Sequence, residues 1–228
     1  MVKLFIATPA FDGRVHVPYA IALAETQAQL ALKGIDSQLQ INVAGSLLVA
    51  ERNRLNKAFL ASDCTHMLCI DSDLGWPASA VLAMLDADVD FVGGLYPARG
   101  LDNTFLYRAY ENPDFSLIFN GKNLAKMQYI PAGFMLLKRV VIERMTAHFA
   151  HKYFEPKSAE LKHENGYCLF ETEVMDGEFW GEDYVFCRRA REAGFDIWVD
   201  HLIEFDHAGT RGAFYQLLRQ KDTADEIL

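Results

Sequence analysis

The chain has 228 residues and a formal net charge of −9, and 51% of its residues are hydrophobic. This length can bury a substantial core, and we predict one domain, 1–228, because no Pro-, Gly- or Ser-rich stretch separates two parts. The acidic balance disfavours non-specific nucleic-acid binding, which needs Lys and Arg to neutralise phosphates. No apolar run in the sequence approaches the length of a membrane span.

Four cysteines indicate the redox environment. Cys64, Cys69, Cys168 and Cys187 lie in apolar contexts without Cys-x-x-Cys spacing. This pattern predicts buried free thiols rather than disulfides or zinc ligands, and it favours a reducing cytoplasm. The opening residues MVKLFIATPAF lack a long apolar region, so we expect a first strand there rather than a signal peptide.

The first third of the chain alternates strand and helix patterns. A β-rich run covers 3–8 and is broken by Pro9, an amphipathic helix covers 16–33, and a second strand covers 37–42. Gly34 lies where a helix C-terminal cap is expected. The alternation predicts an α/β fold with a largely parallel sheet, and a nucleotide could lie at the end of the first strand.

The next predicted helix carries an arginine on its apolar stripe. Leu48, Leu55 and Phe59 mark the stripe, and Arg52 falls between the first two. A buried arginine is costly unless it pairs with a carboxylate or a phosphate. Three interpretations stay open: contact with a nucleotide, a structural ion pair to Asp71, or a side chain that extends to the helix edge.

The segment His66 to Asp73, HMLCIDSD, is an apolar run that stops at two aspartates one residue apart. Period-two alternation places Asp71 and Asp73 on the same strand face as Cys69. Two such carboxylates offer hard oxygen ligands to Mg²⁺ or Mn²⁺ and leave coordination positions for substrate phosphates. Alone the tripeptide is a weak signal, because aspartates at strand ends also cap helices and satisfy turns.

The middle of the chain changes pattern. A fourth strand is predicted at 89–93, and short aromatic-rich strands in 104–129 predict an antiparallel excursion. Residues 129–138 return to a buried strand, in which Ala132 and Gly133 would permit close approach of a bound molecule.

A second concentrated signal lies at 179–195, where an amphipathic helix follows Trp180. Asp183 precedes the buried-stripe residue Phe186 by three positions, so we expect it on the interior side. Glu182 and Asp183 have an ordinary role in a helix's first turn, where the dipole stabilises carboxylates. Their place beside Trp180 also makes a catalytic base plausible.

The last predicted strand, 203–207, turns His207 inward, where a hydrogen-bonded core histidine is the alternative to a ligand. The small residues around Arg211 could wrap a phosphate. We expect an amphipathic surface helix over 213–228.

The order of these signals resembles the nucleotide-sugar-dependent glycosyltransferases of GT-A fold, in particular the family 2-like bacterial and phage enzymes. The likeness covers most of the chain. It is carried by Glu51-Arg52-Asn53, Asp71-Ser72-Asp73, Pro131-Ala132-Gly133-Phe134, Gly181-Glu182-Asp183, Arg188 or Arg189, Gly194 and His207. The resemblance implies a Rossmann-like, mostly parallel central sheet flanked by helices, with a small antiparallel excursion.

The resemblance also implies roles on the donor side. Asp73 would bind Mn²⁺ or Mg²⁺, Asp71 would contact the ribose or the metal, and His207 would supply a further metal ligand. The donor-side residues are then Thr8, Pro9, Arg52, Asp71, Ser72, Asp73 and Arg211.

On the acceptor side, the resemblance implies that Glu182 and Asp183 carry the base that deprotonates the acceptor hydroxyl, with Asp183 favoured by its place in the motif. Ala132, Gly133 and Trp180 would line the acceptor site. The acceptor itself is left open between a glycan, a lipid-linked molecule and a small molecule.

The predicted function is therefore metal-dependent transfer of a sugar from a nucleoside diphosphate sugar, UDP-linked, to an acceptor hydroxyl. The Glu-Asp pair favours inversion, whereas His207-Ala208-Gly209 is similar to a segment of some retaining enzymes and leaves the stereochemistry open. A nucleotidyltransferase is one alternative, although the loop TPAFDGR is poor in the glycines and basic residues it would need. The other is a non-catalytic nucleotide-sugar-binding protein, for which Asp73 would matter and Asp183 would not.

Overall fold

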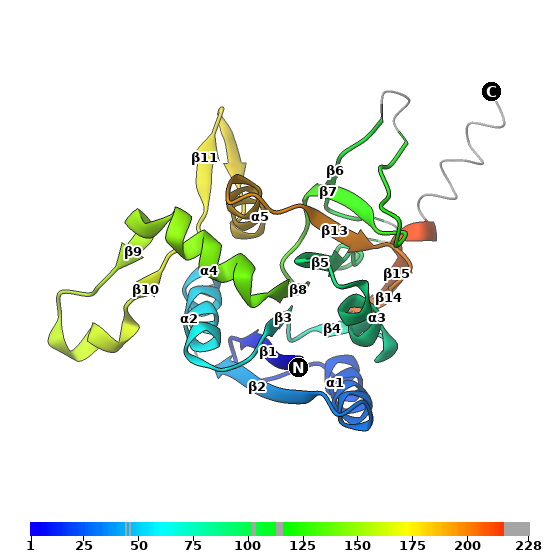
Figure 1. The fold of residues 1–228 in the computed structure, drawn as a ribbon, viewed down its shortest axis with the longest axis horizontal. Coiled ribbons are helices and arrows are strands. Elements are labelled where there is room, and N and C mark those ends of the chain that lie inside the picture. The colour runs from blue at the N-terminus through cyan, green and yellow to red at the C-terminus, as the bar shows by residue number, and fades with distance from the viewer. Residues whose placement is uncertain (44, 46, 102–103, 113–115, 217–228) are drawn as a thin grey trace.

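The computed structural model describes residues 1–43, 45, 47–101, 104–112 and 116–216 (Figure 1). Its centre is a sheet with the strand order β2-β1-β3-β8-β5-β13-β7-β6. In that order the strands are Asp36–Val43, Lys3–Ala10, His66–Ile70, Phe134–Lys138, Phe91–Gly94, Ile197–Asp200, Ala125–Tyr129 and Arg108–Ala109.

The central sheet is mostly parallel. β1 pairs in parallel with β2 and β3, and β13 pairs in parallel with β5. β8 runs antiparallel to both β3 and β5, and β7 runs antiparallel to both β13 and β6. Only β7 and β8 are therefore reversed, so the predicted α/β class with a mostly parallel sheet is confirmed.

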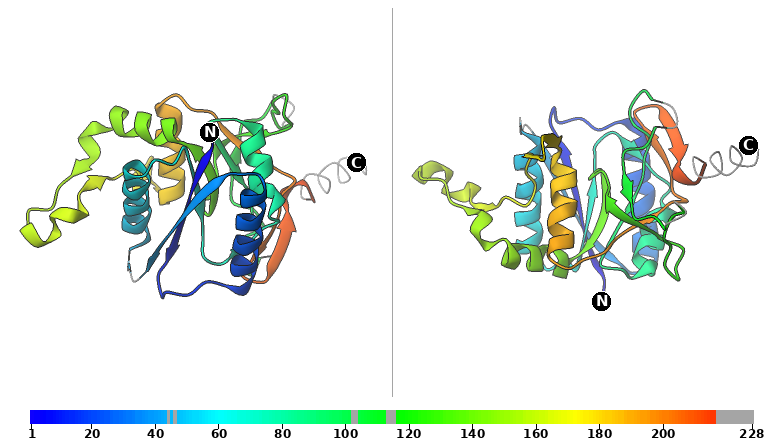
Figure 2. Two further views of the ribbon diagram at one scale, coloured as in Figure 1. Left: turned by 60° about the horizontal axis from the view of Figure 1, so that its bottom comes forward. Right: turned by 90° about the horizontal axis from the view of Figure 1, so that it is seen from above.

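Helices cover both faces of the sheet (Figures 1 and 2). The helices are α1 Val17–Leu32, α2 Leu48–Ala61, α3 Ser79–Ala87, α4 Arg139–His148 and α5 Glu182–Glu192. One buried cluster joins alternate strand residues such as Phe5 and Met67 to α2, α4 and α5. The other joins the intervening residues, such as Ile6 and Leu68, to α1 and α3. Because successive side chains of a strand point to opposite faces, each strand contributes alternate residues to the two cores.

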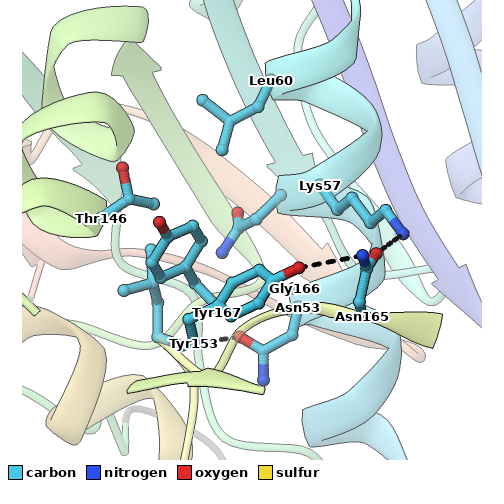
Figure 3. A pocket seen from close by; sticks show the side chains of 10 residues that line it. Asn53, Lys57, Leu60, Thr146, Tyr153, Asn165, Gly166 and Tyr167 are labelled. Carbon is cyan, nitrogen blue, oxygen red and sulfur yellow. Dashed lines mark hydrogen bonds between the residues drawn. The ribbon is translucent and has the colours of Figure 1, made fainter. Parts of the chain in front are cut away.

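Three small antiparallel sheets complete the structure. They consist of β4 Leu74–Gly75 with β14 Glu204–His207 and β15 Thr210–Ala213, of β9 Tyr153–Phe154 with β10 Gly166–Tyr167, and of β11 Glu173–Met175 with β12 Glu178–Trp180. The β9–β10 hairpin, with the short helices η1 Ala150–Lys152 and η2 Ala159–Glu164, extends away from the body (Figures 1 and 2). A cavity lies between this hairpin, α2 and α4 (Figure 3).

The structure corrects the sequence prediction in two places that bear on function. β3 ends at Ile70, so Asp71 and Asp73 lie in the turn that follows and period-two alternation does not apply to them. The predicted strand 129–138 is not continuous: Tyr129 ends β7, β8 begins at Phe134, and residues 130–133 between them form a loop in which the N–H of Gly133 donates to the Tyr96 hydroxyl.

Some of the other sequence predictions are confirmed and others are wrong. Leu48, predicted to be buried, is 44% exposed, whereas Leu55 and Phe59 are buried. The four cysteines are free thiols, as predicted, and three of them are buried, whereas Cys168, also predicted to be buried, is partly exposed. Within the described ranges, no helix combines the length and apolar character needed to span a membrane. Most of the predicted helix 213–228 lies outside the described residues.

The end of α2 depends on Arg139, the first residue of α4. Its guanidinium donates to the carbonyl oxygens of Phe59 (2.9 Å), Ser62 (2.8 Å) and Cys64 (2.7 Å). It also lies 4.6 Å from the centroid of the Phe59 ring. The Phe59 carbonyl also accepts from Ser62, and the other two carbonyls follow the helix, so Arg139 adds charged donors to the turn after α2 and joins that turn to α4.

We therefore expect Arg139→Leu to lower the free energy of unfolding by about 3 kcal/mol, because several carbonyls lose charged donors at once. Urea unfolding followed by circular dichroism measures the change. The matched control is Arg144→Leu on the same helix, whose guanidinium packs over Phe195 at 4.6 Å. Its loss should be about 1 kcal/mol or less, and equal losses in the two variants would contradict the capping role.

Candidate active site

Arg52 lies at the centre of the candidate site. Its side chain comes from α2, is 4% exposed, and places Nη2 2.8 Å from Oδ1 of Asp71. Nε lies 3.5 Å from Oε1 of Glu182, at the start of α5. Burial opposes the positive charge, but the carboxylates of Asp71 and Glu182 outweigh it and raise the pKa of Arg52 above its usual value. Of the interpretations open from sequence, the ion pair to Asp71 is observed.

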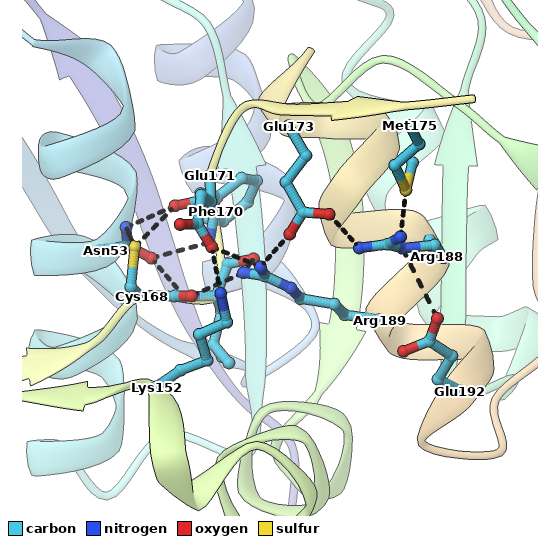
Figure 4. A network of polar contacts seen from close by, with 11 residues as sticks. Asn53, Lys152, Cys168, Phe170, Glu171, Glu173, Met175, Arg188, Arg189 and Glu192 are labelled. Atoms are coloured by element: carbon cyan, nitrogen blue, oxygen red, sulfur yellow. Dashed lines mark hydrogen bonds and ion pairs between the residues drawn. The ribbon is translucent and has the colours of Figure 1, made fainter. Parts of the chain in front are cut away.

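The segment 168–173 is bonded to Asn53 of α2 and to Arg189 of α5 (Figure 4). Asn53 accepts hydrogen bonds from the backbone N–H groups of Leu169 and Phe170, both at 2.9 Å, and donates to the Phe170 carbonyl at 2.8 Å. The Phe170 ring stacks on Phe186 of α5 at 4.1 Å, and the Arg52 guanidinium lies 5.7 Å from its centroid. The segment thus joins α2 to α5 next to Arg52.

Arg189 holds the same segment from α5 and is only 1% exposed. Figure 4 shows its guanidinium between the backbone of Cys168 and the carboxylates of Glu171 and Glu173. The distance to the Cys168 carbonyl is 2.6 Å, and that to Glu173 is also 2.6 Å. A buried cation with this many hydrogen bonds fixes the segment 168–173, which carries the Phe170 ring next to Arg52.

The backbone of Asp71 is hydrogen-bonded to Gly133, in the loop between β7 and β8. Its N–H donates to the carbonyl of Gly133 at 3.0 Å, and the N–H of Gly133 donates to the hydroxyl of Tyr96 at 3.0 Å. A Cβ at position 133 would lie 2.4 Å from the Tyr96 hydroxyl and 2.6 Å from Oδ2 of Asp71. Gly133 therefore permits a close approach, as predicted, but the groups that approach belong to the protein.

Asp183 follows Glu182 on α5. Of these two carboxylates, Glu182 forms the direct ion pair with Arg52. Oδ1 of Asp183 accepts the N–H of Tyr184 at 2.8 Å. Burial, followed by the neighbouring charge of Glu182, raises the pKa of Asp183 to about 6. The helix N-terminus alone would favour ionisation, so burial outweighs the dipole here. A carboxyl with this pKa is suited to accept a proton near neutral pH.

Tyr96 connects Asp183 to Asp71. Tyr96 is partly buried, and burial, followed by the charge of Asp71, raises its pKa well above the usual value, with a smaller contribution from Asp183. Tyr96 and the two aspartates are thus within electrostatic reach of one another. Trp180 packs nearby, with its ring 4.9 Å from that of Tyr129.

Asp73 belongs to a separate cluster on the other side of the turn. Its Oδ2 lies 3.4 Å from Nε2 of His207 and forms an ion pair with Arg99. The other ring nitrogen of His207, Nδ1, lies 2.7 Å from the carbonyl oxygen of Pro97. Because a carbonyl only accepts, Nδ1 must carry the proton of this bond, and a neutral His207 then presents the lone pair of Nε2 to Asp73.

A carboxylate oxygen and an imidazole lone pair that face each other fit a divalent cation between them, and metal-bound histidines characteristically donate their second nitrogen to a carbonyl. The fit extends to two ligands only. Asp71, the third predicted ligand, is held by Arg52. The described residues contain no cluster of three or more His, Cys, Asp and Glu side chains that could hold a metal.

A cleft of about 310 Å³ opens beside this turn. It is lined by Pro9, Phe11, Gly45, Leu48, Glu51, Asp71, Ser72 and Asp73. Phe11 is 68% exposed and lies at the end of β1, where an aromatic ring can stack on a planar ligand. The cleft is within the size range of small-molecule sites.

Two predicted donor-side residues lie away from the cleft. Thr8 is fully buried, and its hydroxyl bonds to that of Tyr19 at 2.6 Å. Arg211 pairs with Asp206 at 3.0 Å and lines a different groove, next to α1. Pro9, Ser72, Asp71 and Asp73 line the cleft itself.

Sequence reasoning missed Tyr96, Arg99 and Phe11 as members of the site. All three lie in loops without a periodic pattern, and their importance comes from contacts with distant segments. The pair Gly93-Gly94 before Tyr96 was the only local signal.

Comparison with protein-family models gave no match, and comparison with curated proteins gave none. Similar solved structures include GalNAc-T7 with UDP, GalNAc and Mn²⁺, at 8% identity and a TM-score of 0.47, over 96% of this chain and 48% of that chain. TarS 1–349 of S. aureus with UDP-GlcNAc has 13% identity and a TM-score of 0.48, over 96% and 65%. The inositol-1-phosphate CTP transferase of T. maritima has 10% identity and a TM-score of 0.46, over 92% and 90%.

This chain thus spans about half the length of GalNAc-T7 and about two thirds of the TarS fragment. The function proposed below rests on the chain's own residues.

The ion pairs of Arg52 predict that the fold loses stability when this charge is removed. Arg52→Met removes the cation that two partly buried carboxylates share, so the free energy of unfolding at pH 7 should fall by about 3 kcal/mol. Urea unfolding at pH 7 measures this loss. A double variant, Arg52→Met with Asp71→Asn, should recover part of the loss, and an undiminished loss would argue against the ion pair.

Proposed function

We propose that the chain is a metal-dependent glycosyltransferase that moves a sugar from a nucleoside diphosphate sugar to an acceptor hydroxyl. One observation carries the proposal: the buried Arg52 is bound by Asp71 from the turn after β3 and by Glu182 from the start of α5. The donor-side turn and the carboxylate pair are thereby joined at one guanidinium. A transfer reaction needs this proximity of leaving group and base.

The nucleotide would lie in the cleft beside Pro9, Phe11 and Ser72. Phe11 supplies an exposed ring for the base, and Asp73 with His207 would hold a divalent cation at the diphosphate end. That cation would stabilise the negative charge that develops on the departing diphosphate. Arg99 pairs with the same oxygen of Asp73 and is exposed, so it could move to the phosphates when the cation binds. The donor is most simply UDP-linked.

On the acceptor side, we assign the base to Asp183 and a positioning role to Glu182. Glu182 is engaged with Arg52, whereas Asp183 has its pKa raised to about 6 and makes its one described hydrogen bond to a backbone N–H. Deprotonation of an acceptor hydroxyl by a carboxylate opposite the leaving group gives inversion at the anomeric carbon. Trp180 would pack against the acceptor.

The donor half of the proposal is tested at Asp73. Asp73→Asn should weaken the binding of Mn²⁺ and of the UDP–Mn²⁺ complex by about tenfold or more, because the anionic ligand is lost. Arg99→Gln should strengthen Mn²⁺ binding without nucleotide, because it removes the competing cation from Oδ2. Isothermal titration calorimetry with Mn²⁺ alone and with UDP measures both. Unchanged affinity in both variants would remove Asp73 from the metal site.

The acceptor half is tested at Asp183. Asp183→Asn keeps the side-chain size and should reduce transfer by about 10²–10⁴-fold while donor binding persists. A base must be ionised to act, so transfer by the unmodified chain should fall as the pH drops below about 6. Release of UDP from a panel of UDP-sugars and acceptors reports the rate, and NMR reports the anomeric configuration. Near-normal turnover in the variant would exclude the base role, and retention would exclude inversion.

The same variant has a stability signature that needs no substrate. The pKa of Asp183 is about 6 in the folded chain against 3.8 for an ordinary Asp, so ionisation is less favourable in the folded state. The resulting destabilisation is absent below about pH 4, grows between pH 4 and 6, and is complete above pH 6. Asp183→Asn should therefore raise the free energy of unfolding by about 3 kcal/mol at pH 8. At pH 3.5 it should change little.

A further inference from the structure

The loop that follows β5, residues 95–101, contacts both members of the pair that faces a cation. Arg99 pairs with Asp73, and the Pro97 carbonyl accepts the Nδ1–H of His207 at 2.7 Å. These two contacts come from residues two positions apart in sequence. The geometry of the loop therefore decides how the carboxylate and the imidazole lie relative to each other.

Tyr96, on the same loop, reaches the other aspartate of the turn through its hydroxyl. The hydroxyl accepts the N–H of Gly133 at 3.0 Å, and the Gly133 carbonyl accepts the N–H of Asp71, also at 3.0 Å. Oδ1 of Asp71 in turn lies 2.8 Å from Nη2 of Arg52. Hydrogen bonds therefore lead from Tyr96, through a single residue, to the carboxylate that pairs with the buried guanidinium.

The ring of Tyr96 contacts the imidazole of the cation-facing pair. It lies edge-to-face with His207, with centroids 5.1 Å apart, and with the buried Phe205, at 5.9 Å. These two partners are alternate residues of β14 and share one face of that strand. With Nδ1 bonded to Pro97 and the ring packed against Tyr96, Nε2 of His207 is kept 3.4 Å from Asp73.

Packing alone does not account for a tyrosine at position 96. A phenylalanine would fill the same space and make both ring contacts. The hydroxyl makes its one described hydrogen bond to the N–H of Gly133, a buried residue. Loss of that acceptor leaves a buried donor unsatisfied, so the loop at Gly133 would have to shift, and with it the backbone of Asp71.

We propose that Tyr96 is a positioning residue with two separable roles. Its hydroxyl, acting through Gly133, holds Asp71 where it pairs with Arg52, and its ring holds His207 toward Asp73. The link to transfer and to a metal rests on the function proposed above, whereas the link to the Arg52 ion pair does not. The tests below keep these two parts distinguishable.

A double-variant cycle in urea tests the hydroxyl without any substrate. Tyr96→Phe should lower the unfolding midpoint of the unmodified chain. In the Arg52→Met background the shift should be less than about half as large, because contacts within one network are not additive. Asp71→Asn is a second background with the same expectation, which covers a failure of Arg52→Met to fold. Equal shifts in the unmodified and variant backgrounds would overturn the proposal.

The matched control is Tyr19→Phe, which removes another tyrosine hydroxyl, bonded to Thr8 at 2.6 Å. This pair lies outside the Arg52 network, so its shift should be the same in every background. A reduced shift for Tyr19→Phe as well would mean that the backgrounds blunt any variant, and the role assigned to the Tyr96 hydroxyl would be rejected.

Titration calorimetry with Mn²⁺ alone tests the ring. Tyr96→Phe keeps the ring and should leave the Mn²⁺ affinity within about twofold, whereas Tyr96→Leu should lower it by about tenfold or more, as for other groups that orient a metal ligand. Equal affinities in these two variants would overturn the ring's role. If the unmodified chain binds no Mn²⁺, the metal site proposed above is contradicted, and the urea cycle alone decides the role of Tyr96.

Steady-state transfer separates positioning from plain stability. On folded protein, Tyr96→Phe should lower kcat by about tenfold or more and leave the donor KM within about threefold, because small displacements of aligned groups slow the reaction more than they weaken binding. An unchanged kcat would overturn the proposal. Absence of transfer by the unmodified chain would contradict the proposed function instead, and the urea cycle would still decide whether Tyr96 positions Asp71.

Discussion

The structure depends on a buried guanidinium that cannot remain without counter-charges. Arg52 lies on the core-facing side of α2, where desolvation of an unpaired cation would cost several kcal/mol. Its partners come from parts of the chain far apart in sequence, the turn after β3 and the start of α5. The need to satisfy one charge therefore fixes how a strand end and two helices meet, and the candidate active site lies where they meet.

The charge balance around Arg52 explains the behaviour of Asp183. Burial is the largest cause of the raised pKa of Asp183, and the charge of Glu182 is the second. Asp71 and Glu182 already bind the single cation directly, so Arg52 offsets only part of these effects. The local excess of carboxylates is consistent with a site that holds a proton near neutral pH and that accepts cations with its substrate.

The fold was largely predictable because it follows from periodicity. Alternation of apolar residues along β1, β3 and β8 gives two cores, and the repeating strand and helix patterns give a mostly parallel sheet. The site was predictable only in part. The motif residues Arg52, Asp71 and Asp183 stand out in the sequence because polar groups interrupt apolar patterns. Which cation pairs with which carboxylate is set by loops such as 95–99, where no period exists, and this is why Arg99 and Tyr96 were missed.

The contacts of Asp71 and Asp73 were also not predictable from periodicity. A strand would have turned both carboxylates to one side, but β3 ends at Ile70, and Asp71 makes one more bond in the same register, from its N–H to the carbonyl of Gly133 just before β8. The turn then sends Asp71 to Arg52 and Asp73 to His207. The turn at Ser72 and Asp73 therefore separates an ion-paired aspartate from one that faces an imidazole, and no local pattern in the sequence records it.

Helix α2 shows what a buried polar face can mean. Four of its six buried residues are polar, namely Glu51, Arg52, Asn53 and Asn56. A helix selected for packing alone would carry apolar residues there. Arg52 and Asn53 use this face to fix Asp71, Glu182 and the Phe170 segment, and their polarity is explained by those contacts. Asn56 lies one turn further along the same face without such a contact. Burial of a polar residue on α2 therefore indicates a role only where the structure shows the groups that satisfy it, as at Arg52 and Asn53.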